Sequence, residues 1–354
     1  MILKKIFNLL KSWLGLFISF VAISMFNIRL RVLYLHFLSF IGNIGLKLFP
    51  SIYKSLDAQN KKYSSGHRIK ESYQAKEDFN NFLIEAEKTN LTKEQIYSRL
   101  ENNGGIKSTI LSTPLEKIFD HANRDIEVGV QYSGGCDSTL AAMLAARYFR
   151  KVHLLNFYHP FIREKERSEF NANKMIAMFG KEKVKYARID TTDTFTRILF
   201  GNYFGDLAKF KTFVVGVGCL ACKISFDVHI IKYAMEHNIQ LVLDGADLSV
   251  KSQLSQGDEG ILKARHEFYS EHGIEFKHPA ARFENNPHEM FVLGMEANPP
   301  QIMYAEQPEC IGNQFLNEIY DRFYFLPKYG IDSHSEKGLA WFFDKRSVCK
   351  GIIA

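Results

Sequence analysis

Residues 133–139, "SGGCDST", gather two glycines, an acid and three hydroxyl side chains between an apolar run and an alanine-rich run. This pattern predicts a turn that joins the end of a strand to the start of a helix. Glycines at such a turn let backbone N–H groups approach an anion, and the helix N-terminus adds partial positive charge. Asp137 could bind a phosphate-bridging Mg²⁺ or cap the helix. We therefore interpret the segment as a phosphate-binding loop, with these candidate contacts: Ser133, Gly134, Gly135, Asp137, Ser138 and Thr139.

A second group of reactive side chains is the C-x-x-C formed by Cys219 and Cys222. It follows the apolar run 212–218, "TFVVGVG", which we expect to be a strand. A thiolate near the N-terminus of a following helix is a good nucleophile or metal ligand. Two buried structural cysteines and a zinc knuckle are the alternatives.

Acidic and basic residues follow the next apolar run, 239–247, "IQLVLDGAD". Asp244 and Asp247 lie where contacts to a metal and to phosphate would be made, although Asp and Gly also build ordinary turns. Lys251 and Arg265 are candidate phosphate partners. His266, His272 and His278 are scattered in the sequence, and no metal role is assigned to them.

The elements that must position these groups alternate between strand and helix from about residue 126. Strands rich in Val, Ile and Leu and spaced by helices predict a parallel sheet buried on both faces. We expect an α/β protein with a five-stranded, Rossmann-like sheet, which binds ligands at the carboxyl ends of its strands. The expected strands are 127–133, 151–159, 184–190, 212–218 and 239–247.

Four regions are expected along the chain. They are an apolar helical segment (1–50), a helical accessory region (51–122), the nucleotide-binding domain (123–255) and a C-terminal region of mixed structure that carries Cys310 and the expected substrate contacts (256–354).

Composition limits the classes of partner. The chain of 354 residues has a formal net charge of +6, which permits a nucleotide, RNA or an acidic membrane surface as partner and requires none of them. Its five cysteines are an odd number in a long chain, which argues against a secreted disulfide framework.

The first 50 residues contain two uncharged stretches, 12–28 and 32–46, separated by Arg29 and Arg31. A spanning helix needs about 20 apolar residues, so the first stretch is marginal and the second is short. Three interpretations stay open: one signal-anchor helix, a pair of helices lying in the membrane interface, or an apolar lobe packed on the main domain.

The loop sequence "SGGCDS" (133–138) resembles the SGGxDS motif of the PP-loop ATP pyrophosphatase superfamily, also called the adenine nucleotide α-hydrolase-like or HUP group. The resemblance implies that ATP is cleaved between its α- and β-phosphates and that AMP is transferred to a substrate oxygen. The adenylated carbon is then attacked by a nitrogen or sulfur nucleophile. The resemblance also implies that adenine lies near the ends of the second and third strands, at residues 156–158, which include Phe157, and at residues 188–190.

Two groups of that superfamily are similar to the cysteine region. In tRNA thiolases a cysteine in comparable surroundings acts with a second one further on, which implies Cys222 and Cys310 here. Other thiolases hold an iron–sulfur cluster, which Cys219, Cys222 and either Cys310 or Cys349 could bind. Lipopolysaccharide sugar amidotransferases combine SGGxDS with C-x-x-C and transfer ammonia.

The sequence thus favours an ATP- and Mg²⁺-dependent adenylating transferase that activates a substrate oxygen for sulfur transfer, with Asp137, Cys222 and Cys310 in catalysis. The C-x-x-C could instead hold Zn²⁺ or part of a cluster. The alternatives are an ATP-dependent amidotransferase acting on a sugar or other small molecule, and a non-catalytic nucleotide sensor or membrane-anchored scaffold. Expected partners are ATP, an acceptor that could be a tRNA, and a protein donor of sulfur or ammonia. The expected location is the cytoplasm or the cytoplasmic face of a membrane.

Overall fold

The computed structural model describes residues 110, 113–163, 167–210, 214–246, 259–283, 286–295, 309–310 and 336–353. The apolar segment 1–50 and nearly all of the accessory region 51–122 lie outside these residues, as do Asp247 and Lys251. The three interpretations of the N-terminal segment therefore stay predictions.

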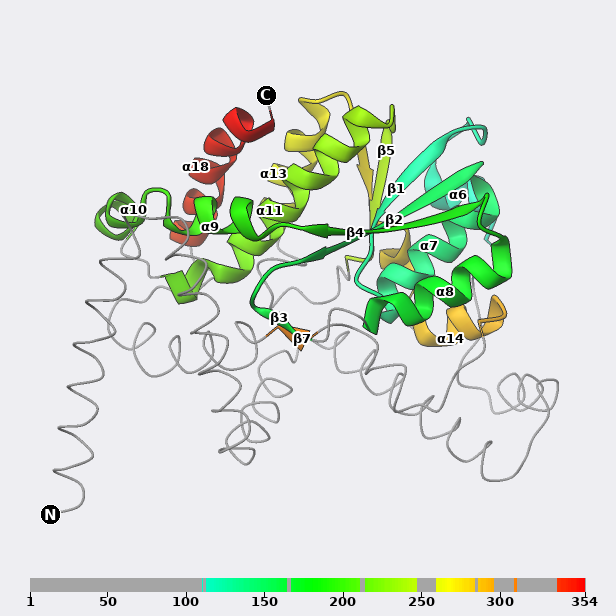
Figure 1. Ribbon diagram of the computed structural model, residues 1–354. Helices are drawn as coiled ribbons and strands as arrows, with labels where there is room; N and C mark the ends of the chain where they lie inside the picture. The colour runs from blue at the N-terminus through cyan, green and yellow to red at the C-terminus, as the bar shows by residue number, and fades with distance from the viewer. Residues whose placement is uncertain are drawn as a thin grey trace, which may run out of the picture.

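A five-stranded, all-parallel sheet forms the centre of the molecule, which confirms the expected α/β, Rossmann-like fold (Figure 1). Its spatial order is β4-β2-β1-β5-β6. The strands are β1 (Glu127–Gln131), β2 (Lys151–Tyr158), β4 (Val184–Asp190), β5 (Leu241–Asp244) and β6 (Glu275–Lys277). In the central strands Val128 pairs with Val152 on one side and with Leu241 on the other.

Helices cover both faces of this sheet. One face carries α7 (Cys136–Tyr148), α8 (Arg167–Phe179) and α14 (Asn286–Val292). The other carries α9 (Thr192–Phe200), α10 (Tyr203–Phe210), α11 (Val214–Glu236), α13 (Glu259–Ser270) and α18 (Glu336–Ile353). Successive residues of a strand point to opposite faces, so Leu154 packs with the first layer and Leu155 with the second. Each such side chain, when fully buried, contributes about 1.5–3 kcal/mol to folding.

The expectation of a strand at residues 212–218 is wrong. Residues from Val214 onward open α11, a helix of 23 residues. Short apolar runs fit a buried strand and a buried helix equally well by periodicity. Here the run continues into a long apolar helix whose residues, such as Leu220, Ile224 and Ile231, are buried against the sheet and α18. Packing therefore overrides the strand preference of the valines.

The fifth strand is β6, which pairs with β5 through Leu241 and Glu275. It lies in the region expected to form a separate C-terminal part, so the sheet domain extends past residue 255 to at least residue 277. Helix α18 also belongs to this domain, because its Trp341 and Phe342 lie in the same core as α11.

Smaller elements complete the described structure. Helix α6 (Leu115–Phe119) and the 3₁₀ helix η1 (Pro279–Arg282) lie beside the α7 layer. Strands β3 (Ile162–Arg163) and β7 (Glu309–Cys310) form a two-stranded antiparallel pair.

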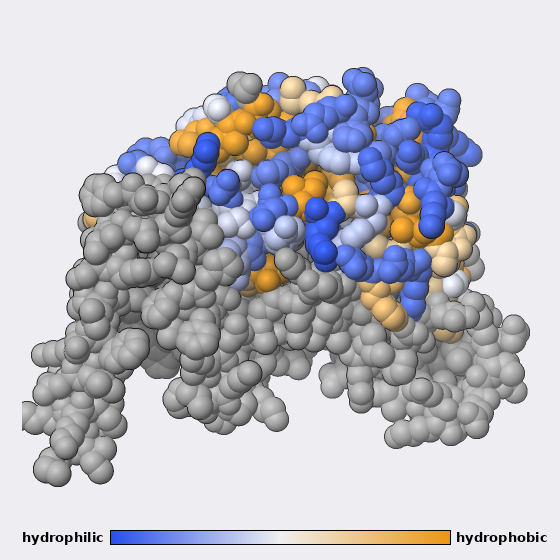
Figure 2. Space-filling model, viewed as in Figure 1, coloured by the Kyte–Doolittle hydropathy of each residue, from blue (hydrophilic) through white to orange (hydrophobic). Residues whose placement is uncertain are grey.

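The surface of the described residues is mostly hydrophilic on the face shown in Figure 2, where hydrophobic residues form separate patches. None of the helices described here combines the length and the apolar character needed to cross a bilayer.

Candidate functional site

The predicted phosphate loop lies where the strand order reverses. From β1 the chain moves to β2 and β4 on one side, and then returns to β5 and β6 on the other side. Open α/β sheets bind ligands at such a switch point, outside the carboxyl ends of the strands. Residues 132–135 connect β1 to α7, and Gly245 follows β5. The β1–α7 connection, with Gly134 and Gly135, and the segment after β5, with Gly245, therefore both lie at the switch point.

Hydrogen bonds within the loop hold its backbone in a defined shape. The Ser138 hydroxyl accepts from Ser133 N at 3.2 Å and donates to Gly135 O at 3.1 Å. The Ser133 hydroxyl lies 3.0 Å from that of Ser138 and accepts from Gly135 N at 3.3 Å. Gly134 has φ of 83°, a left-handed conformation that favours glycine. The serines thus stabilise the turn. Gly135 is the N-cap of α7, and because it has no side chain, it cannot cap the backbone amides of the first helical turn.

Thr139 has a different place from the one expected. It is fully buried, and its hydroxyl donates to the Tyr132 hydroxyl at 3.4 Å. Because the side chain faces the core, it supports the loop from behind and does not present its hydroxyl to a phosphate at the surface.

Two asparagines from distant elements also hold the loop. Asn171 of α8 donates from Nδ2 to Gly134 O at 2.8 Å, and Asn286 of α14 donates from Nδ2 to Asp137 Oδ1 at 2.6 Å. Both asparagines are buried. The sequence carried no signal for either, because isolated asparagines far from the motif do not differ from turn or cap residues.

Gly245 lies directly against the start of α7. A Cβ atom at this position would lie 2.3 Å from Ser138 N and 2.6 Å from the carbonyl carbon of Asp137. Only a glycine therefore lets the end of β5 approach the loop so closely.

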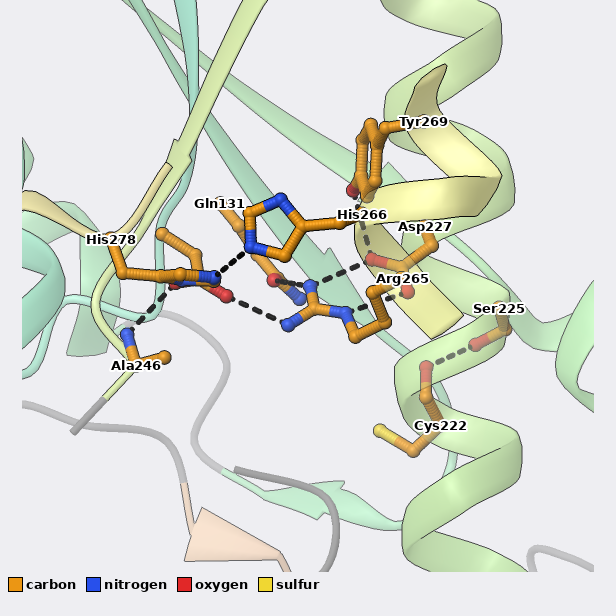
Figure 3. Close-up of polar contacts among 10 residues, drawn as sticks. Gln131, Cys222, Ser225, Asp227, Ala246, Arg265, His266, Tyr269 and His278 are labelled. Atoms are coloured by element: carbon orange, nitrogen blue, oxygen red, sulfur yellow. Dashed lines mark hydrogen bonds and ion pairs between the residues drawn. The ribbon is translucent and has the colours of Figure 1, made fainter. Parts of the chain in front are cut away.

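A buried ionic network joins the ends of β1 and β5 behind the loop (Figure 3). Arg265 of α13 is fully buried and donates from Nε and Nη2 to Asp227 of α11, at 2.9 and 2.8 Å. It also donates from Nη1 to Asp244 at 2.8 Å and from Nη2 to Gln131 at 2.9 Å. Tyr269 adds a hydrogen bond of 2.8 Å to Asp227. Four of the five guanidinium N–H groups are thus used inside the protein.

This network changes the expected roles of Asp244 and Arg265. Burial alone would raise the pKa of Asp244, but His278 and Arg265 outweigh it and hold this pKa well below its ordinary value. Burial alone would likewise lower the pKa of Arg265, but Asp227 and Asp244 outweigh burial and raise it. Both side chains are charged and mutually satisfied, so they act as a scaffold for the loop and not as contacts to phosphate or metal.

His278 and His266 extend the network toward the surface. His278 Nδ1 hydrogen-bonds to Asp244 Oδ1, and His278 Nε2 lies 3.1 Å from His266 Nε2. These two histidines lie 12 residues apart in the sequence, which gives no sign that they meet. They are brought together by the pairing of β6 with β5 and the packing of α13 on β6.

Cys222 lies within α11, eight residues after its start, so the charge at the helix N-terminus does not act on it. A histidine contacts it instead: His159 Nε2 lies 3.1 Å from Cys222 Sγ. Since His159 Nδ1 accepts from Phe161 N at 3.3 Å, the ring proton sits on Nε2, which donates to the sulfur. Burial lowers the pKa of His159 to about 3, so this imidazole is neutral.

Three further cysteines are candidates from the sequence. Cys219 lies on the same helix, one turn before Cys222, and is partly buried. Cys310 pairs through its backbone with Ile162, while its side chain is outside the described part of the structure. Cys349 is buried in the core, and burial raises the pKa of its thiol to about 12. No group of three or more His, Cys, Asp or Glu side chains that could hold a metal occurs among the described residues.

The region expected to receive adenine contains one unused acceptor. Asn156 is buried and donates from Nδ2 to Tyr132 O at 2.9 Å, but its Oδ1 receives no hydrogen bond from the described residues. Phe157 is buried and stacks on Phe226, with ring centroids 5.0 Å apart. Asp190 accepts from Thr192 N at 2.8 Å, and Arg188 pairs with Glu169 at 2.8 Å.

Lys223, next to Cys222, lies on α11, the helix that also carries Asp227 of the ionic network. Burial lowers its pKa and so does Arg265, while Asp244 and Asp227 act in the opposite direction. Its ammonium group is therefore within electrostatic reach of the ionic network.

Comparison of the chain with protein-family models gives no match, and a search of curated proteins also finds no similar sequence.

Proposed function

We propose that this protein binds ATP on the 133–138 loop, cleaves it between the α- and β-phosphates, and adenylates an acceptor for sulfur transfer. The proposal extends the resemblance of "SGGCDS" to the PP-loop ATP pyrophosphatase superfamily. The observation that carries it is the position of this loop at the β1/β5 switch point, where Gly245 packs against the first turn of α7.

The residues around the loop fit an anionic nucleotide. The loop brings backbone amides to the N-terminus of α7, a helix of 13 residues, where partial positive charge favours phosphate. The serine hydroxyls hold the shape of the loop by bonding to its own backbone. A bound triphosphate would thus meet a backbone already held in one conformation, which reduces the entropy lost on binding.

The residues also fit Mg²⁺ next to the loop. Asn286 Nδ2 is bonded to Asp137, but the buried Asn286 Oδ1 receives no hydrogen bond from the described residues. Carboxylate and amide oxygens are among the oxygen ligands that Mg²⁺ takes, together with phosphate oxygens. When bound, the metal would offset the charge of the phosphates. Asp137 and Asn286 would hold it, and Asn171 would keep Gly134 in place.

Sulfur transfer is favoured over amide formation by the contact between His159 and Cys222. An N–H donor aimed at a sulfur atom stabilises negative charge on that atom, which is the nucleophilic form of a thiol. The neutral His159 cannot remove the thiol proton at Nε2, because that nitrogen already carries one. Its role is to orient the sulfur and to stabilise its charge.

The first experiment measures the products formed from ATP and Mg²⁺. We expect AMP and pyrophosphate, and we expect Asp137→Asn to slow their release by at least tenfold. Asp193→Asn is the matched control, because Asp193 also lies in the first turn of a helix but is exposed on α9. ADP and phosphate as products, or no binding of a non-hydrolysable ATP analogue, would contradict the proposal.

A second experiment separates the roles of the cysteines. In sulfur transfer by Cys222 with Cys310, C222S and C310S release pyrophosphate but form no thiolated product, whereas C219S forms it. A metal held by the C-x-x-C would make C219S and C222S fail together and lose the metal. A sugar amidotransferase would form its product in C222S. The product is identified by mass spectrometry of RNA and small molecules from cells with and without the protein.

A further inference from the structure

Three side chains, Asp244, His278 and His266, form a hydrogen-bonded series, and Figure 3 labels the two histidines. Asp244, at the carboxyl end of β5, is 2% exposed, and the side chain of His278 is 9% exposed. His266, on α13, is exposed to solvent. The series is continuous, because Asp244 Oδ1 bonds to His278 Nδ1 and the two Nε2 atoms of the histidines are 3.1 Å apart.

Asp244 fixes the position of the proton on His278. Its Oδ2 accepts from Arg265 and its Oδ1 accepts from Ala246 N at 2.9 Å, so this carboxylate is ionised and acts only as an acceptor. His278 must therefore carry its proton on Nδ1. The Nε2 atom of a neutral His278 is then an acceptor as well.

When His278 is neutral, the hydrogen between the two histidines therefore belongs to His266. With its proton on Nε2, a neutral His266 has a lone pair on Nδ1. The described residues use this histidine only through Nε2, and the ring is exposed. Nδ1 of His266 is thus the atom at which the series can take up a proton from outside.

Asp244, at the inner end of this hydrogen-bonded series, lies close to the loop. Gly245, which follows Asp244, contacts the backbone of Asp137 and Ser138. The 3₁₀ helix η1, which follows His278, packs against α7. Both ends of the Asp244–His278 pair are thus attached to the helix that carries the phosphate loop.

From this geometry we propose that Asp244, His278 and His266 form a proton relay, and that His266 Nδ1 accepts the proton lost by the nucleophile that attacks the α-phosphorus of ATP. This inference rests on the proposed function, because it assigns the base of that reaction. The nucleophile Nu–H gives its proton to Nδ1, so that neutral His266 becomes an imidazolium, and it forms a bond to the α-phosphorus with the electron pair it keeps. The bond from this phosphorus to the α,β-bridging oxygen breaks, and pyrophosphate leaves with that electron pair. His266 can then pass its Nε2 proton to His278, whose positive charge lies against Asp244.

The charges that face the two rings are consistent with this role. Asp244 approaches from β5 and Arg265 from α13, while Lys223 of α11 acts on Asp244. The neutral ring of Phe276, from β6, packs against both histidines, with centroids 5.3 and 4.7 Å away. Burial lowers the pKa of His266 and the charge of Arg265 lowers it further, while Asp244 acts in the opposite direction. His266 is therefore unprotonated, and able to act as a base, at neutral pH.

The relay is tested first without nucleotide, by ¹⁵N NMR of the imidazoles in the full-length protein. H266Q and H278Q identify the signals. We expect the Nδ1–H form for His278 and the Nε2–H form for His266. We also expect H278Q to shift the titration midpoint of His266. The opposite tautomers, or two imidazoles that titrate independently, would overturn the proposal.

The second measurement is pyrophosphate release from ATP between pH 5.5 and 9, with water as the nucleophile. H266Q should lower kcat by about 10²–10⁴-fold and remove the loss of rate at acid pH. H272Q is the control, because His272 follows α13 and its imidazole bonds, among the described residues, to Phe268 O at 2.9 Å and not to the relay. An unchanged pH profile in H266Q would overturn the proposal. No pyrophosphate from the wild-type protein would refute the proposed function instead, and the NMR result would then decide the relay by itself.

Discussion

At the scale of single residues, the contact between β5 and the loop depends on the absence of one side chain. Gly245→Ala would place a Cβ atom 2.3 Å from Ser138 N, and the obstructing atoms belong to the backbone and cannot rotate away. We expect a loss of about 1–3 kcal/mol in the free energy of unfolding. Since the loop must move, ATP binding should weaken as well. Urea unfolding and calorimetric titration with ATP measure the two effects.

Gly218→Ala is the control for this substitution. Gly218 lies inside α11, and a Cβ atom there would meet nothing within 4 Å. Alanine in a helix interior is more favourable than glycine by up to about 1 kcal/mol, so this variant should be as stable as the wild type or more stable. Equal losses in the two variants would show that the close contact at Gly245 does not matter.

Arg265 is a second residue whose contribution to the free energy of unfolding can be measured by substitution. Arg265→Met keeps most of the side-chain volume but leaves Asp227 and Asp244 buried without their cation. Breaking such a network by removing one partner costs about 3–5 kcal/mol. Arg150→Met, at a 57% exposed arginine that pairs with Asp125, should cost no more than about 1 kcal/mol. Chemical denaturation of both variants tests this difference.

The sequence identified the residues of the loop but not those that support it. "SGGCDS" is informative because glycines, an acid and hydroxyls are adjacent at one turn. Asn171, Asn286 and His278 come from three other segments, and they reach the site only after the sheet has formed. Single residues of common types carry no local pattern, so no reading of one sequence could select them.

At the scale of elements, the long strands of the sheet were easier to predict than the shortest one. The expected strand 184–190 coincides with β4, and the expected strand 151–159 is β2 with one residue more. β6 has three residues, "EFK", of which two are charged, and this is too short for a periodic pattern. The apolar start of α11 was mistaken for a strand, which also misplaced the C-x-x-C at the sheet edge.

The attachment of α18 to α10 gives a prediction at this scale. Lys345 and Trp341 of α18 both bond to Asp206 of α10, at 2.8 and 3.0 Å, and all three side chains are buried. Asp206→Ala leaves the Lys345 ammonium buried and unpaired, which costs about 3–5 kcal/mol. We expect α18 to detach before the sheet unfolds, because the sheet does not depend on this contact.

Tryptophan fluorescence can follow this detachment. The chain has two tryptophans, so Trp13→Phe leaves Trp341 as the single reporter. In D206A its emission should shift to the red at a lower urea concentration than the loss of circular dichroism. The control is Asp344→Asn, which breaks an exposed pair between the same two helices, with Lys209. Coincident transitions in D206A would show that α18 and the sheet unfold together.

At the scale of the whole molecule, the buried histidines make stability depend on pH. The ordinary pKa of histidine is 6.5, and burial lowers that of His159 to about 3. Between these values the unfolded chain binds a proton that the folded protein excludes. The free energy of unfolding therefore falls as pH falls, by about 1.4 kcal/mol per pH unit for this group. His153 and His229 act in the same direction, because burial lowers their pKa values too.

Asp244 acts in a different pH range, which allows the histidines to be studied separately. Because its pKa is lowered well below 3.8, its contribution to stability is fully present above that pH and is lost only below it. Urea unfolding at pH 7, 6 and 5, which lie above the ordinary pKa of the carboxylates, should thus report mainly on histidine. His159→Gln should flatten the dependence by about 1 kcal/mol per pH unit. Phe195→Leu, which removes the ring stacked on His159 at 4.0 Å, should lower stability and keep the slope. If H159Q keeps the wild-type slope, His159 is protonated in the folded protein, and its hydrogen bond to Cys222 does not require a neutral ring.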